Sequence, residues 1–105
     1  MSGPLSGIKI IDLSSVISGP VATVLLADQG ADVIKVEAPQ GDIVRRMGLG
    51  KNNLSPAFVS ANRGKRSICI DLKEPKGLVV VKKLVAEADV FIQNFRPGAI
   101  ERMGL

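Results

Sequence analysis

The sequence contains no histidine and only one cysteine, Cys69. Without histidine, the chain cannot by itself form a Ser-His-Asp triad, a Cys-His dyad or a histidine-containing metal site. An internal disulfide is excluded because it requires two cysteines. Cys69 lies between isoleucines in SICID, so we predict a buried structural thiol rather than a nucleophile. We expect no bound metal.

Aromatic residues are also scarce, with three phenylalanines and neither tryptophan nor tyrosine. The 46% of hydrophobic residues therefore predict an aliphatic core, within one domain of 105 residues. No apolar run reaches the ~18 residues of a membrane helix, and MSGPLSG does not resemble a signal peptide. We expect a cytoplasmic chain with no membrane partner. The net charge of +4 suits an anionic ligand, but too few aromatics accompany the basic residues to favour nucleic acid.

Apolar runs alternate with segments of helical periodicity along the chain. We predict strands at 8–13, 32–37, 67–72 and 89–93. We predict helices from a Ser18 cap to Gly30, near 56–61, from Pro75 onwards, and over 97–103. This alternation indicates parallel strands joined by right-handed crossovers, and strands apolar on both faces indicate helices on both sides. The predicted fold is α/β, a Rossmann-like three-layer sandwich with a mainly parallel sheet of about four strands.

Ligands of open parallel sheets bind beyond the carboxyl ends of the strands, beside helix N-termini. Lys73, Asn94 and Arg96 follow predicted strand ends and therefore fall on this side, and Arg102 lies farther along the last predicted helix. A guanidinium, backbone N–H groups and a helix dipole that converge near Arg96 would form an anion site. The alternative is that Arg96 lies in solvent and the Pro-Gly pair after it is only a turn.

Other charged residues have two interpretations each. Arg63, Lys65 and Arg66 precede the third predicted strand, so they belong either to a solvated loop at the opposite edge or to a binding site. Asp12 and Asp71 stand at strand ends, either as paired carboxylates or, as we favour, as acceptors for loop N–H groups.

The motifs of common nucleotide sites are absent from the sequence. DLSSVISGP follows the first predicted strand in place of G-x-G-x-x-G, and no P-loop occurs. Glu37 ends the second predicted strand, where a dinucleotide fold has an acidic residue for the ribose. One matching element without the glycine loop does not identify a dinucleotide site.

Four segments carry a family resemblance: GPLSGIKIIDLSSVISGP, LLADQGADVIKVEAPQGD, NRGKRSICIDLKEPKG and ADVFIQNFRPGAIERMGL. In this order they resemble the N-terminal part of family III CoA-transferases. That group includes the formyl-CoA, carnitine and bile-acid-inducible CoA-transferases and the related α-methylacyl-CoA racemases. The resemblance covers essentially the whole chain. It implies that residues 1–105 are the N-terminal Rossmann-like segment of a longer CoA-transferase, and that this segment binds the nucleotide end of coenzyme A.

The resemblance also implies which residues contact coenzyme A. Ile17 and Ser18 would lie beside the thiol arm, residues 70–73 would border the adenine and its phosphates, and the arginines would contact phosphate. The full set is Ile17, Ser18, Ile70, Asp71, Leu72, Lys73, Asn94, Phe95, Arg96 and Arg102. Arg63 is a secondary candidate.

The sequence departs from the family pattern after the second predicted strand. Family members often have an arginine where this chain has Ala38. Either Arg45 or Arg46, from the next loop, replaces this arginine as a phosphate ligand, or the chain binds phosphate more weakly than its relatives do. Glu74 occupies a helix-capping position where a shorter side chain would cap better by ~1 kcal/mol.

In this family an aspartate attacks the acyl-CoA carbonyl, and the reaction passes through a mixed anhydride and an enzyme–CoA thioester. The matching position lies beyond Leu105, so we expect a fragment or truncated form that is inactive alone and has no catalytic residue of its own. The implied substrates are a CoA thioester and a carboxylic acid, and the full-length family forms an interlocked homodimer. Two alternatives stay open: the same segment of an acyl-CoA racemase, and a non-enzymatic nucleotide-binding module.

Overall fold

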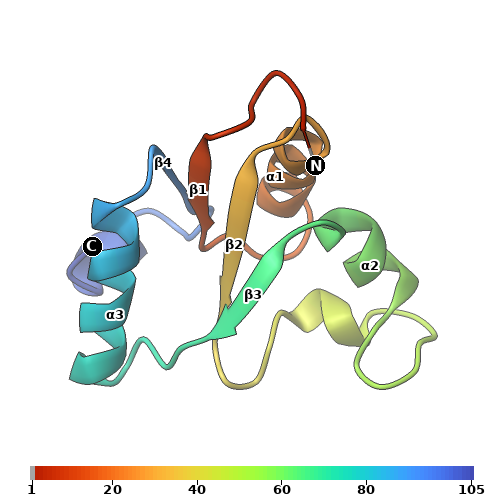
Figure 1. Cartoon of the computed structure of the whole chain (residues 1–105). Helices are drawn as coiled ribbons and strands as arrows, with labels where there is room; N and C mark the ends of the chain where they lie inside the picture. Colours follow the sequence, from red (N-terminus) through yellow and green to blue (C-terminus); the bar gives the residue numbers. More distant parts are fainter. Residues whose placement is uncertain (1) are drawn as a thin grey trace.

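The computed structural model describes residues 2–105, in which four parallel strands form one sheet of order β3-β2-β1-β4. Figure 1 shows the elements in chain order. They are β1 (Lys9–Asp12), α1 (Ser18–Asp28), β2 (Asp32–Glu37), η1 (Ile43–Arg46), α2 (Pro56–Asn62), β3 (Arg66–Cys69), α3 (Pro75–Ala86), β4 (Val90–Ile92) and α4 (Ala99–Arg102). The predicted α/β class and parallel sheet are confirmed.

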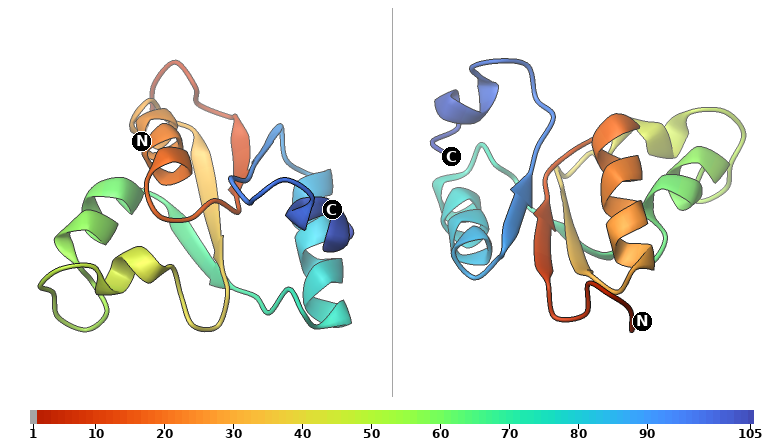
Figure 2. Two further views of the ribbon diagram at one scale, coloured as in Figure 1. Left: turned by 180° about the vertical axis from the view of Figure 1, so that it is seen from behind. Right: turned by 90° about the horizontal axis from the view of Figure 1, so that it is seen from above.

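Helices cover both faces of the sheet, as predicted. The view from above in Figure 2 places α1 and α2 on one side of the strands, and α3 and α4 on the other. Successive strand residues point to opposite faces. Ile11 accordingly packs in the cluster with Val81 of α3, whereas Ile10 packs in the cluster with Ala27 of α1.

The parallel register brings the ends of neighbouring strands to one edge of the sheet. Asp12 of β1 is paired with Lys35 of β2 and with Ile92 of β4, and Glu37 of β2 is paired with Cys69 of β3. The loops that follow the four strands therefore start side by side. We call this side the carboxyl edge.

The helix starts agree with the sequence at α2 and α3 but not at α1 and α4; the last helix was expected from residue 97 and begins at Ala99. Ser55 caps α2 by accepting the N–H of Phe58 at 3.1 Å, and Pro56 follows it. Glu74 caps α3 without a side-chain hydrogen bond, as its length predicted. The predicted cap of α1 is wrong: Ser18 is already helical, Ile17 is the capping residue, and no side chain bonds the free N–H groups.

The prediction that Cys69 is buried is also wrong, because the thiol is exposed. β3 is an edge strand and ends at Cys69, although the apolar run predicted a strand to residue 72. Ile68 and Ile70 pack against the α3 side of the sheet. Because side chains alternate along a strand, the side chain of Cys69, between these two isoleucines, points to the opposite face.

The 3-10 helix η1 was not predicted from the sequence.

No helix within residues 2–105 combines the length and the apolar character needed to cross a bilayer.

Candidate functional site

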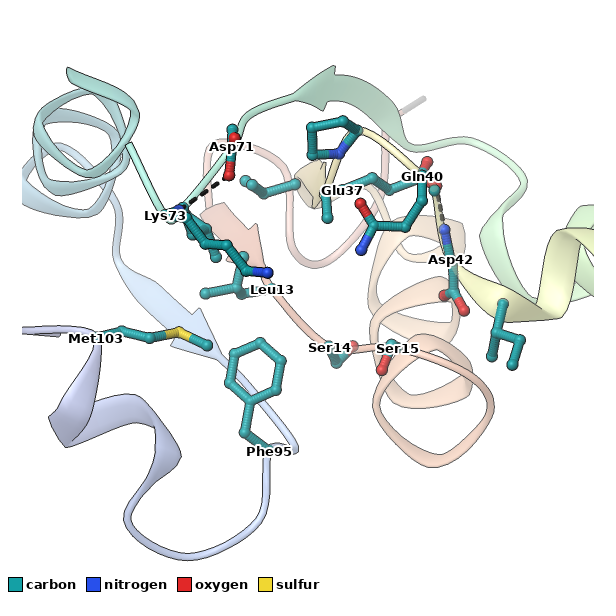
Figure 3. A pocket seen from close by; sticks show the side chains of 16 residues that line it. Leu13, Ser14, Ser15, Glu37, Gln40, Asp42, Asp71, Lys73, Phe95 and Met103 are labelled. Carbon is teal, nitrogen blue, oxygen red and sulfur yellow. Dashed lines mark hydrogen bonds between the residues drawn. The ribbon is translucent and has the colours of Figure 1, made fainter. Parts of the chain in front are cut away.

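A pocket of about 590 Å³ opens at the carboxyl edge of the sheet (Figure 3). The loops after β1, β2, β3 and β4 all contribute to it, together with the C-terminal segment. Its lining residues are Leu13, Ser14, Ser15, Val36, Glu37, Ala38, Pro39, Gln40, Gly41, Asp42, Ile43, Asp71, Leu72, Lys73, Phe95 and Met103. β1 lies between β2 and β4 in the sheet. The chain continues from β1 to β2 and β3 on one side of β1, and it later returns to add β4 on the other side. This is the switch point at which ligands of parallel sheets bind.

The two ends of the pocket differ in chemistry. Phe95 and Met103 lie across from Lys73 at one end, and Gln40 and Asp42 lie at the other end (Figure 3). A flat apolar group fits the first end, and the ammonium of Lys73 offers a charge to an anion there.

Asp71 shapes the loop that carries Lys73. Its carboxylate accepts the N–H of Lys73 at 3.0 Å, so the favoured interpretation of Asp71 as an acceptor for a loop N–H is confirmed. The neighbouring Ile70 is 7% exposed and belongs to the core under α3. Only the residues after it reach the pocket.

Asn94 is a clamp on the loop between β1 and α1. Its side-chain oxygen accepts the N–H of Ser15 at 3.0 Å, and its amide donates to the carbonyl of Ser15 at 2.9 Å. The same amide donates to the hydroxyl of Ser18 at 3.4 Å. Ile17, between these serines, is 52% exposed. Asn94 therefore joins the loop after β4 to the loop after β1.

Arg96 and Arg102 are exposed and lie outside the pocket lining. Within residues 2–105, neither arginine belongs to an ion pair. The Arg102 guanidinium lies over Gly98, where a Cβ would stand 2.8 Å from Nη1. Of the ten residues that the family resemblance implied, the pocket brings together Asp71, Leu72, Lys73 and Phe95. It does not include Ile17, Ser18, Ile70, Asn94, Arg96 and Arg102.

Lys65 and Asp12 form a buried ion pair that the sequence did not reveal. Their atoms approach to 2.9 Å, with side chains 1% and 0% exposed, so neither a solvated loop nor a ligand contact describes Lys65. Asp12 also accepts the N–H and hydroxyl of Ser14 and the hydroxyl of Thr23. Burial alone would raise the pKa of Asp12, but these hydrogen bonds and Lys65 outweigh it and lower the pKa below its ordinary value.

Two further basic residues, one before β3 and one that opens it, form exposed ion pairs. Arg63 contacts Asp28 at 2.6 Å, and Arg66 contacts Asp32 at 2.7 Å. Asp32 opens β2, so Arg66 lies at the edge of the sheet opposite the pocket. Neither arginine lines the pocket at the carboxyl edge.

Glu37 is held by Arg45 rather than left free for a ligand. Arg45 donates to its two oxygens at 2.8 and 2.7 Å and stacks on Phe58, with 3.8 Å from the guanidinium carbon to the ring centre. Burial alone would raise the pKa of Glu37, but Arg45 and the N–H of Asp42 lower it. Arg46 donates to the carbonyl of Gln40. Arg45 was one candidate to replace the arginine missing at Ala38, but its guanidinium is bonded to Glu37 and is not free to contact a phosphate.

Lys35 and Asp42 form a second buried pair at 3.1 Å, and both side chains are 2% exposed. This pair was not predicted from the sequence. A signal was present, because Lys35 and Glu37 occupy alternate positions of a strand predicted to be buried on both faces. Buried charges require partners of opposite charge, so this pattern predicts an acidic partner for Lys35 and a basic partner for Glu37.

Residues 5–105 match the family model of CoA-transferase family III. The chain belongs to this family. It is 48% identical over 104 residues to succinyl-CoA:glutarate CoA-transferase of Mus musculus, which covers 97% of this chain and 24% of the mouse protein. It is 50% identical over 110 residues to succinate–glutarate CoA-transferase of Agrobacterium fabrum, covering 97% of this chain and 28% of that protein. The resemblance in the sequence is confirmed.

Solved structures agree with the family III assignment. A CAIB/BAIF family protein from Brucella suis matches with a TM-score of 0.93 and 42% identity, over 100% of this chain and 29% of that chain. A putative betaketoacyl-ACP reductase matches with a TM-score of 0.55 and 18% identity, which shows a shared fold alone. The chain spans about a quarter of the length of its family III relatives.

Proposed function

We propose that this chain is the CoA-binding N-terminal domain of an acyl-CoA:carboxylate CoA-transferase. The observation that carries the proposal is the pocket at the carboxyl edge, where the loops after all four strands meet. Family membership supplies the ligand class, since its relatives are named as transferases of CoA.

The chemistry of the pocket supports a nucleotide with phosphates at one end. Leu72, Phe95 and Met103 form an apolar wall that suits the adenine ring, and Lys73 beside them suits a phosphate. Arg96 and Arg102, on the loop after β4 and the helix that follows, carry charges without ion-pair partners in residues 2–105. We propose that these two arginines extend the phosphate site beyond the pocket.

Of the three carboxylates that line the pocket, Glu37 and Asp42 do not oppose phosphate at that end, and Asp71, beside Lys73, accepts the N–H of Lys73. Arg45 neutralises Glu37, and Lys35 neutralises Asp42. Both carboxylates belong to the end of the pocket away from Phe95 and Met103. We therefore propose that the thiol arm of CoA passes this end, near Ile17 and Ser18.

The engagement of Glu37 also argues against NAD as the ligand. A dinucleotide fold uses an acid at this place to accept hydrogen bonds from a ribose. Here Arg45 and the N–H of Asp42 already bond both oxygens of Glu37. A ribose would have to displace a bidentate guanidinium, which costs more than its hydroxyl contacts return.

For the whole enzyme we propose the family's reaction, in which CoA moves from a thioester to a carboxylic acid. The proposal places the nucleophilic aspartate outside this chain, which is therefore inactive alone. We further propose a cytoplasmic, homodimeric enzyme. The single cysteine is compatible with a reducing compartment, and the homodimer rests on the family resemblance. An activity assay of this chain alone tests its inactivity, the mass of the longer protein tests the homodimer, and cell fractionation tests the location.

Calorimetric titration of the chain with CoA, ADP and NAD at low salt tests the ligand. We expect CoA to bind most tightly and ADP more weakly, because ADP lacks the pantetheine arm. NAD should not bind. Binding of NAD without binding of CoA would overturn the proposal, and failure of CoA to bind would remove its support.

The phosphate contact is tested by Arg96→Ala. We expect CoA binding to weaken by about 1–3 kcal/mol, because a hydrogen bond to a charged group is lost. Arg66→Ala is the matched control, since Arg66 is also exposed but lies at the opposite edge of the sheet. An equal loss in both variants would show only general attraction between a basic protein and an anion, and an unchanged affinity in Arg96→Ala would remove Arg96 from the site.

A further inference from the structure

Val16 adopts a backbone conformation that β-branched residues rarely take. Its φ is 67°, in the left-handed region, and it lies in the loop between β1 and α1. A valine there crowds its own backbone, at a cost on the order of 1–3 kcal/mol. Something in the surrounding structure must hold Val16 in place.

Asp42 is the group that holds Val16. The N–H of Val16 donates to both oxygens of the Asp42 carboxylate, at 3.1 Å each. The same carboxylate accepts the N–H of Val44 and caps η1. Because η1 and the carboxylate are fixed together, the carboxylate presents a rigid acceptor to a loop 26 residues earlier in the chain.

Lys35 holds Asp42 in turn. Its ammonium lies 3.1 Å from Oδ2 of Asp42 and 3.3 Å from the carbonyl oxygen of Ser14. It is anchored on β2 and almost fully buried. Lys35 therefore contacts the loop after β1 directly, and again through Asp42.

We propose that the Lys35–Asp42 pair is a positioning device that holds residues 14–17 in the conformation that receives the ligand. The inference rests on the proposed function for the identity of that ligand. Ser14 and Ser15 line the pocket, and Ile17, two residues after Ser15, is exposed. Asn94 clamps the same loop at Ser15 from the opposite side. A loop fixed before binding need not be ordered on binding, and affinity is higher for that reason.

Lys35 and Asp42 are positioning residues, because they act on the ligand through the loop. A pair of matched variants separates this role from a general contribution to stability. Lys35→Met/Asp42→Asn and Lys35→Met/Asp42→Ala both remove the two buried charges. The first keeps a carbonyl oxygen that can accept the N–H of Val16, and the second does not.

The first measurement is CoA affinity. We expect the asparagine variant to bind CoA about two- to threefold more weakly than the wild type, because it loses the Lys35 bond to Ser14, and the alanine variant to bind about 3- to 10-fold more weakly than the asparagine variant, as for one further lost hydrogen bond. Equal affinities in the two variants would overturn the proposal. Val33→Ala is the control for simple destabilisation, because Val33 is buried in the cluster with Ile10 and Ala27, and none of these residues lines the pocket. Its CoA affinity should equal that of the wild type.

The second measurement is hydrogen exchange of the Val16 amide without ligand. We expect slow exchange in the wild type and the asparagine variant, and fast exchange in the alanine variant. If CoA binds none of these proteins, the proposed function fails while this comparison still decides the positioning role. If the alanine variant does not fold, the wild type alone remains decisive: exchange of Val16 at the rate of an unstructured peptide would overturn the proposal.

Discussion

Against α3, the sheet presents Ile11, Leu13 and Val36, which pack with Val81 in one aliphatic cluster. Against α1 and α2, the same two strands present Ile10 and Val33 first, and then the charged residues Asp12, Lys35 and Glu37. All of these side chains are buried. The face under α3 is therefore stabilised by packing of aliphatic side chains. The face under α1 and α2 is stabilised, in the half nearer the carboxyl edge, by buried ion pairs.

The two faces differ in how strictly the fold determines which side chains they can hold. Aliphatic side chains can exchange with others of similar volume at modest cost, whereas a buried charge requires one partner at one distance. The paired residues surround the loop after β1, the loop after β2 and η1, which are the segments that form one end of the pocket. The charged face thus fixes the shape of the site, and the aliphatic face holds the strands beneath it.

The largest effect that separates the two faces is expected for Lys65→Met. The variant leaves Asp12 buried without its counter-ion and should lower the free energy of unfolding by about 3–5 kcal/mol. Lys65→Met/Asp12→Asn is the control, since it removes both charges and should recover much of this loss. Urea unfolding measures both variants. A double variant as unstable as Lys65→Met would show that the methionine itself does not fit.

Acid affects the charged face without any substitution. Because the pKa values of Asp12 and Glu37 are lowered in the folded protein, their contribution is complete above the unfolded values and is lost as the pH falls. We expect the free energy of unfolding to decline below about pH 5. Glu37→Gln should start less stable and decline less steeply. Parallel pH profiles for the two proteins would contradict the role of Glu37.

A cavity on the aliphatic face should cost less. Val81→Ala removes two methyl groups from a fully buried side chain, and we expect a loss of about 2 kcal/mol, measured by urea unfolding. The loss should be the same at pH 4 and at pH 7, because the buried members of this cluster are all aliphatic side chains. If the loss in free energy of unfolding depended strongly on pH, the aliphatic face would not be independent of charge, which contradicts the comparison.

The smallest effect is expected at the start of α3. Glu74→Ser places a short hydroxyl side chain at the capping position, and we expect a gain of about 0.5–1 kcal/mol. Ser18→Ala is the counterpart at α1 and should change stability by less than about 0.5 kcal/mol, because Ser18 makes no capping bond. Thermal unfolding compares the two. A larger effect at Ser18 would mean that it caps α1 after all.

The sequence predicts most of the architecture because the signals for it are local. The strand predicted at 32–37 is found at Asp32–Glu37, and prolines mark the starts of α2 and α3. Cys69 shows the limit of such signals. Its isoleucine neighbours indicated burial, but alternation turns the thiol to the other face, at a strand that has a neighbour on one side only.

The candidate site is predicted in part for the same reason. The rule for parallel sheets locates the carboxyl edge, and Lys73 and Phe95 are found there. The clamp by Asn94 joins residues 79 positions apart, and the ion pair of Lys65 with Asp12 joins residues 53 positions apart. Such pairs follow from the tertiary arrangement, so no local pattern predicts them.

The most direct test of the account is a map of amide chemical shifts as CoA is added to the ¹⁵N-labelled chain. If CoA binds at the carboxyl edge, the amides of Ser15, Lys73 and Phe95 shift, and those of Lys9 and Arg66 at the opposite edge do not. Shifts confined to the opposite edge, or saturating binding with no shift around the pocket, would contradict the account.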